Sequence, residues 1–192
     1  MLAPSEVHFE CIRCGACCRQ IEMIVTLTGR DITRIANGLG LTPKQMIRAL
    51  DFYIPHNGDE IPPGLEHIPQ VLTENGLATI ALKKSEDGEC LFLKDSLCMI
   101  HEIRPGACRS FPFVFDNSSE AISWGLSAMK RICPGLGNGA AVKESDIIDT
   151  ATEVLEDLKI YREFTEEWNQ SNITHTVSNL MTSINSDTRF LV

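Results

Sequence analysis

Half of the cysteines in this chain lie within one short stretch, residues 11–18. Cys11, Cys14 and Cys17 are separated by two residues each, a spacing that lets a tight turn direct successive thiolates toward one point. Ferredoxins hold iron–sulfur clusters with the same C-x2-C-x2-C spacing. Cys18 departs from that pattern, because it follows Cys17 directly. We therefore expect Cys17 and Cys18 to point to different places.

The remaining cysteines are separated by wide and irregular gaps, unlike the repeated C-x2-C pairs of a zinc ribbon. All 8 cysteines are candidate metal ligands: Cys11, Cys14, Cys17, Cys18, Cys90, Cys98, Cys108 and Cys133. They allow two four-ligand sites, or one site plus cysteines that are buried as small apolar side chains. We expect Cys11, Cys14 and Cys17 to bind together with a later cysteine, for which Cys108 is the first choice.

Two arginines, Arg104 and Arg109, bracket Cys108. Cations beside a thiol favour its thiolate form. Guanidinium groups also stabilise a cluster that four thiolates make anionic. Both arginines are therefore candidate cofactor-binding residues. The alternative is that they form ordinary ion pairs with Glu102 or Asp95.

The net charge and the distribution of apolar residues argue against two classes of protein, nucleic-acid binders and membrane-spanning proteins. The net charge of -9 argues against nucleic acid as a partner, because nucleic-acid binders carry basic patches. No apolar run approaches the roughly eighteen residues of a membrane span. Residues 1–10 lack the charged and apolar regions of a signal peptide, so we expect a cytoplasmic protein. Thiols stay reduced in that compartment, which favours metal ligands over disulfides.

Several short elements must position these cysteines. Residues 21–27, 77–82 and 121–126 are predicted strands, and residues 90–93 are the predicted hairpin partner of 77–82. Thr28 and Asp31 form a capping-box pattern for a helix that should end near Gly40. A second helix start is predicted at 42–45, whereas the proline-rich residues 54–70 predict a long irregular connection.

The composition changes at about residue 143. Apolar residues at helical spacing predict a long helix capped by Ser145 and ending near Trp168, and a second helix over 173–184. We expect residues 1–142 to form a cysteine-cluster metal-binding domain and residues 143–192 a helical segment packing on it. The predicted fold class is α+β, predominantly helical with short strands and a metal-binding core of irregular loops.

The cysteines stand within longer motifs. These are Phe9–Arg19, Cys90–Leu93, Cys98–Pro105, Cys108–Pro112, Cys133–Gly135 and the helix start Leu27–Ile32. As a set they resemble the CxxCxxCC family of zinc- or iron-chelating proteins, to which flagellin lysine N-methylase is related. The resemblance covers roughly residues 9–137, with His101 as one departure, because the family often has an aromatic residue there. It implies metal binding and leaves the metal open.

The residues favour an iron–sulfur cluster, most simply 4Fe–4S, with zinc as the alternative. Besides the opening triplet, Cys133 is followed by Pro134, as in ferredoxin ligand runs. Paired C-x2-C knuckles, which zinc modules use, are missing from the sequence. We predict a redox, electron-transfer or sensing protein that acts with a protein partner. The alternatives are a protein-lysine N-methyltransferase and a zinc-stabilised interaction subunit of a larger complex.

Overall fold

The computed structural model describes residues 6–54, 65–118 and 120–191, so part of the predicted connection at 54–70 lies outside the described residues. Helices account for 39% of the described residues and strands for 21%. The fold is therefore an α+β mixture, and the prediction of a predominantly helical chain is wrong. The difference arises because segments for which no strand was predicted, such as Leu50–Tyr53, Phe113–Asp116 and Leu136–Ala141, pair into short antiparallel ladders.

The largest sheet has the strand order β2-β4-β3. The central strand β4 (Gly76–Leu82) pairs antiparallel with β2 (Leu50–Tyr53) and with β3 (Val71–Thr73), and its residues from Ala78 onward are buried. This confirms the strand predicted at 77–82. Of the strand predicted at 21–27, only Thr26 forms a bridge, to Ala81.

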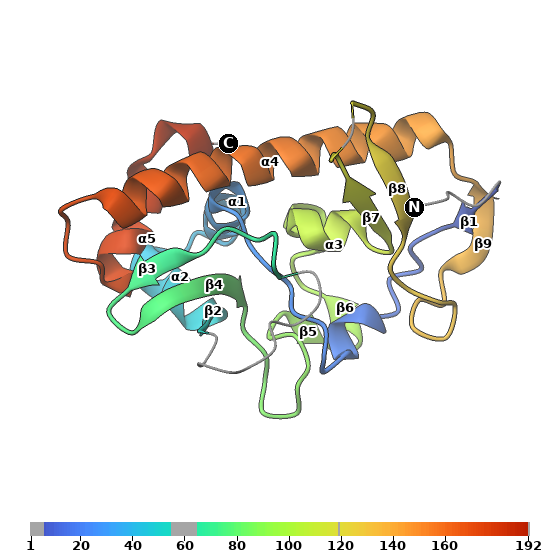
Figure 1. Ribbon diagram of the computed structural model, residues 1–192. Helices are drawn as coiled ribbons and strands as arrows, with labels where there is room; N and C mark the ends of the chain where they lie inside the picture. The colour runs from blue at the N-terminus through green and yellow to red at the C-terminus, as the bar shows by residue number, and fades with distance from the viewer. Residues whose placement is uncertain (1–5, 55–64, 119, 192) are drawn as a thin grey trace.

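The predicted partner of β4 is wrong. Both edges of β4 are already occupied, so residues 90–93 do not join this sheet. Leu93 instead begins the strand β5 (Leu93–Lys94), which forms a small hairpin with β6 (Leu97–Cys98). Cys90 forms a single bridge to Lys84. Cys98 therefore ends this hairpin and Cys90 lies just before it in the chain. In Figure 1 the β5–β6 hairpin lies beside the β2-β4-β3 sheet.

Two further ladders lie at the other end of the molecule (Figure 1). In the first, β7 (Phe113–Asp116) pairs with β8 (Ser123–Leu126), which confirms most of the strand predicted at 121–126. In the second, β1 (His8–Phe9) pairs with β9 (Leu136–Ala141).

Both helix starts predicted from capping-box patterns are confirmed. The helix α1 (Gly29–Leu39) begins with the predicted capping box between Thr28 and Asp31 and ends at Gly40 in the left-handed conformation. The second capping box, between Thr42 and Gln45, starts the short helix α2 (Pro43–Met46).

The C-terminal part holds two more helices. The long helix α4 (Glu144–Gln170) has Lys143 as its N-cap, without a side-chain cap, so the prediction of Ser145 in that role is wrong. Acidic residues in its first turn complement the helix dipole instead. The helix α5 (Val177–Ser186) begins after Thr176, whose side chain accepts a hydrogen bond from the Asn179 amide. Within the described residues, these helices included, none is both long and apolar enough to cross a bilayer.

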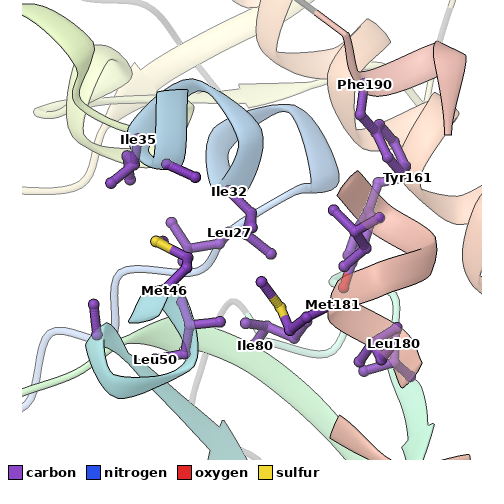
Figure 2. Packing of buried hydrophobic residues seen from close by; sticks show 14 of the residues in the cluster. Leu27, Ile32, Ile35, Met46, Leu50, Ile80, Tyr161, Leu180, Met181 and Phe190 are labelled. Atoms are coloured by element: carbon purple, nitrogen blue, oxygen red, sulfur yellow. The ribbon is translucent and has the colours of Figure 1, made fainter. Parts of the chain in front are cut away.

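Two buried apolar clusters hold these elements together, and α4 contributes to both. The larger joins α1, β4, α4 and α5, with the fully buried Tyr161 facing Leu180, Met181 and Phe190 across the core (Figure 2). The smaller gathers Phe113, Trp124 and Leu136 against Ile147 at the start of α4. The remaining helix, α3 (Gly106–Ser110), packs on α4 between them and carries Cys108.

Candidate metal centre

Five of the eight cysteines line one cavity of about 370 Å³. They are Cys17, Cys18, Cys90, Cys98 and Cys108. The first two lie on a 3-10 turn (Cys17–Arg19) and the last lies on α3. Cys90 lies at its bridge to Lys84, just before β5, and Cys98 lies in β6. The fold thus gathers thiols from positions that are as much as ninety residues apart in the sequence.

The opening cysteine loop is fixed against the hairpin by close backbone contacts. Gly15 has a φ of 68°, and a Cβ built there would meet the Leu93 side chain and the Ser96 carbonyl oxygen at 2.9 Å. A larger residue would therefore be excluded by both space and backbone conformation. The Cys90 amide donates to the Cys18 carbonyl at 2.8 Å, which ties the loop directly to the hairpin.

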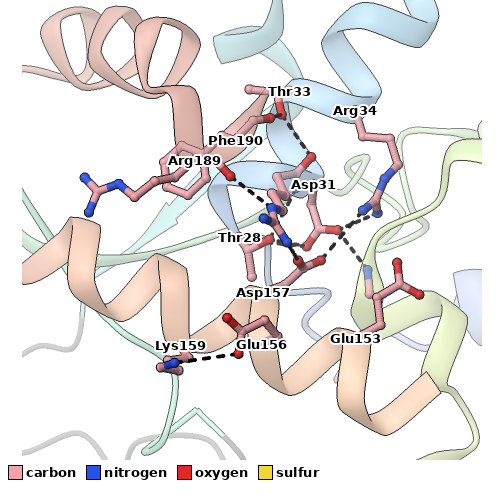
Figure 3. Close-up of polar contacts among 12 residues, drawn as sticks. Thr28, Asp31, Thr33, Arg34, Glu153, Glu156, Asp157, Lys159, Arg189 and Phe190 are labelled. Carbon is pink, nitrogen blue, oxygen red and sulfur yellow. Dashed lines mark hydrogen bonds and ion pairs between the residues drawn. The ribbon is translucent and has the colours of Figure 1, made fainter. Parts of the chain in front are cut away.

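A buried carboxylate positions α3 and with it Cys108. Asp31 Oδ1 accepts hydrogen bonds from the Gly106 amide at 2.9 Å and from Arg34 Nη1 at 3.1 Å, while its Oδ2 accepts from the Thr28 amide and hydroxyl (Figure 3). Burial raises the pKa of Asp31, and the hydrogen bonds and the Arg34 charge act in the opposite direction. The sequence predicts Asp31 as a capping residue, but its link to Gly106 has no local sequence signal.

The thiols on the cavity wall interact with one another. A hydrogen bond from Cys18 lowers the pKa of Cys17 to about 7 and that of Cys98 to about 6. The nearby Arg104 charge acts on Cys98 in the same direction, whereas the pKa of Cys18 is raised because its proton is shared with both neighbours. Cys17 and Cys18 both line this cavity, whereas the sequence led us to expect them to point to different places.

Burial has the opposite effect on the two other cavity thiols. It raises the pKa of Cys90 and that of Cys108. Metal binding requires thiolates. The arrangement therefore offers two thiols that ionise readily and three, Cys18 included, whose ionisation depends on a metal or another cation beside them.

The three remaining cysteines lie elsewhere. Cys11 and Cys14 are exposed, and the Cys11 sulfur is 4.0 Å from both His101 Nε2 and Arg104 Nη1. Cys133 is buried in the smaller apolar cluster. The cavity wall thus includes only the last member of the predicted trio Cys11, Cys14 and Cys17. Within residues 6–54, 65–118 and 120–191, no three His, Cys, Asp or Glu side chains are already close enough to hold a single metal ion.

Comparison with known proteins assigns this cysteine pattern to a family. The model of the CxxCxxCC family, described as "Putative zinc- or iron-chelating domain", matches residues 10–134. The chain belongs to the CxxCxxCC family. No curated protein and no solved structure matches the chain, so the relation to flagellin lysine N-methylase stays a prediction.

The matched residues of this CxxCxxCC domain include all eight cysteines, and metal binding is the property that the family match supports. The cysteine thiolates are suitable donors for metal binding, because soft ligands of this kind suit zinc and iron–sulfur clusters. The five cavity cysteines supply more sulfur donors than the four that either group usually takes.

The two candidate arginines of the CxxCxxCC domain lie in different surroundings. Arg104 lines the cavity, and its Nη1 donates to His101 Nε2 at 2.5 Å. Arg109 instead donates to Glu153 on α4 at 2.7 Å, which is neither of the acidic partners considered from the sequence. Its Nε and Nη2 are buried without a partner among the described residues.

Proposed function

We propose that this CxxCxxCC domain binds an iron–sulfur cluster of the 4Fe–4S type and serves a redox, electron-transfer or sensing function. The observation that carries the proposal is the group of five cysteines on the wall of one cavity. Four of them would hold the cluster, with Cys17, Cys90, Cys98 and Cys108 as the preferred set. When bound, the cluster would supply one-electron chemistry.

The size of the cavity favours a cluster over a single ion. A structural zinc ion is enclosed by four ligands at about 2.3 Å and leaves no space beside it. The cavity of about 370 Å³ is larger than that, and its thiols approach from three separate elements. A polynuclear group uses ligands that stand further apart than those of one ion, so it suits this wall better.

Two positive charges support the same assignment. Arg104 lies at the cavity wall and lowers the pKa of Cys98, so it would stabilise an anionic thiolate cluster there. Lys84 also lines the cavity, and its ammonium group donates to the Gln20 and Ile21 carbonyls. We assign Arg109 a positioning role, because its ion pair with Glu153 ties α3 to α4.

A protein partner is part of this proposal. Large apolar side chains are exposed around the cysteine loop and the hairpin: Ile12 at 49%, Leu91 at 46%, Leu97 at 57% and Met99 at 60%. Electron transfer needs close approach to the cluster, and exposed apolar residues beside it would favour contact with another protein.

The test is anaerobic purification followed by iron, acid-labile sulfide and zinc analysis. We expect about four iron and four sulfide per chain, as in a 4Fe–4S cluster, with visible absorption that bleaches on reduction by dithionite. One equivalent of zinc, no sulfide and no visible absorption would overturn the cluster and favour zinc, which is colourless.

A further inference from the structure

The cavity beside the thiols is not lined by metal ligands alone. A second part of its wall is apolar and includes Met23, Val25, Phe111, Phe113 and Val114. Met23 and Val25 belong to the extended segment before α1, Phe111 is the C-cap of α3, and Phe113 and Val114 begin β7. Four of the five thiols come instead from the turn at Cys17, the bridge at Cys90 and β6. Figure 1 shows β7 beside α3 and the β5–β6 hairpin below both of them.

The apolar side chains of this wall offer little to a charged or strongly polar occupant, although Glu22, Thr26 and Arg104 also line the cavity. The hydroxyls of Ser110 and Ser127, which also line the cavity, already donate to the Ala107 and Pro112 carbonyls at 3.3 and 3.0 Å. The Lys84 ammonium is likewise engaged by two backbone carbonyls. Aliphatic and aromatic side chains supply no ligands for iron or zinc. Metal held by the thiols would therefore leave this wall uncovered.

We propose that this apolar wall binds a small uncharged molecule with an aliphatic or aromatic body, next to the metal. The inference rests on the proposed function for the position of the metal at the thiols. The whole cavity measures about 370 Å³, and metal at the thiols would take part of it, so the space left beside the apolar wall suits a ligand of few atoms. Apolar cavities of this kind bind apolar molecules readily, because water gains few hydrogen bonds in them. The metal centre would then respond to, or act beside, such a ligand.

Straight-chain alcohols from butanol to hexanol are suitable probes. Binding to the metal-loaded protein is measured by titration calorimetry. We expect each added methylene to tighten binding about fourfold, since burying one methylene contributes about 0.8 kcal/mol. Binding that does not depend on chain length, or no binding by the iron-loaded protein, would overturn the proposal.

Two substitutions fill the wall from different elements. Val114→Phe adds bulk from β7 and Ala107→Leu adds it from α3, and both residues line the cavity. Each should weaken hexanol binding more than about tenfold, because the burial of two or more methylenes is lost. The matched control is Leu126→Phe on the partner strand β8, where Leu126 is 38% exposed and lines a different groove.

The outcomes separate this inference from the proposed function. If the iron-loaded protein has normal spectra but its affinity for the alcohols does not rise with chain length, the ligand site alone is refuted. Protein that holds no iron refutes the proposed function whatever the alcohols do. Equal hexanol affinity in a folded filling variant and in Leu126→Phe also refutes the ligand site. Should both filling variants fail to fold, the chain-length series on the unsubstituted protein still decides.

Discussion

Replacing Asp31 by alanine should destabilise the whole fold, because this one carboxylate caps the start of α1 and joins α1 to α3. Its side chain is 3% exposed and bonds to the N-cap of α1, to Arg34 and to the Gly106 amide at the start of α3. Losing a cap interaction costs about 1 kcal/mol. Leaving the buried Gly106 N–H without an acceptor costs about 1–3 kcal/mol more.

The sum is a loss of about 2–4 kcal/mol in the free energy of unfolding. Arg34 retains Asp157, whose Oδ2 is 3.7 Å away, so we add nothing for an unpaired arginine. For a chain of this length, about 2–4 °C per kcal/mol converts the loss to a fall of roughly 4–16 °C in melting temperature. Circular dichroism of the anaerobic metal-loaded protein measures it.

A matched control is Asp149→Ala, which removes an exposed carboxylate on α4. Such a surface change should alter stability by less than about 0.5 kcal/mol. Asp31→Asn should lie between the two, since the amide oxygen still accepts from Gly106 but the charge beside Arg34 is lost. Melting temperatures that agree for Asp31→Ala and Asp149→Ala would refute the role assigned to Asp31.

Three further predictions follow from the core, the thiols and the C-terminus. Phe164→Ala should cost about 3–5 kcal/mol in urea unfolding, because Phe164 is buried in the larger core; a loss below 1 kcal/mol would contradict this. In metal-free protein at about pH 7, iodoacetamide should label Cys98 before Cys108, since the pKa of Cys98 is lowered to about 6 and burial raises the pKa of Cys108. Mass spectrometry of digests measures the order, and earlier labelling of Cys108 would contradict the prediction. Hydrogen bonds from Arg189 lower the pKa of Asp187, so the stability that this carboxylate contributes is complete above its unfolded pKa and is lost as the pH falls below about 4. Asp187→Asn should therefore make the urea midpoint of unfolding depend less on pH in the acid range. A pH profile equal to that of the unsubstituted protein would contradict this.

Local signals in the sequence predicted those parts of the fold that depend on neighbouring residues. Both capping boxes formed as predicted, because a cap is decided within four residues of chain. The buried strand β4 was also predictable from its continuous apolar run. Its partners were not, since strand pairing depends on contacts between segments distant in the chain: β2 and β3 occupy both edges of β4, and Leu93 pairs with Cys98 instead.

The candidate site was predictable in its residue types but not in its grouping. The motif spacing suggested that the first three cysteines converge, yet Cys17 and Cys18 group with Cys98 on the cavity wall. That grouping depends on contacts between distant segments, such as the Cys90 amide on the Cys18 carbonyl and the Gly106 amide on Asp31. Neither contact leaves a periodic or spacing signal in the chain.

The central claim is that the cavity thiols, rather than the exposed opening loop, hold the metal. Iron and sulfide content of Cys98→Ser and Cys14→Ser, purified side by side without oxygen, tests it most directly. Cys98 lines the cavity, whereas Cys14 is exposed and does not lie on that wall. The account predicts that Cys98→Ser loses most of its iron and sulfide and that Cys14→Ser keeps them. Retention by Cys98→Ser together with loss in Cys14→Ser would contradict it.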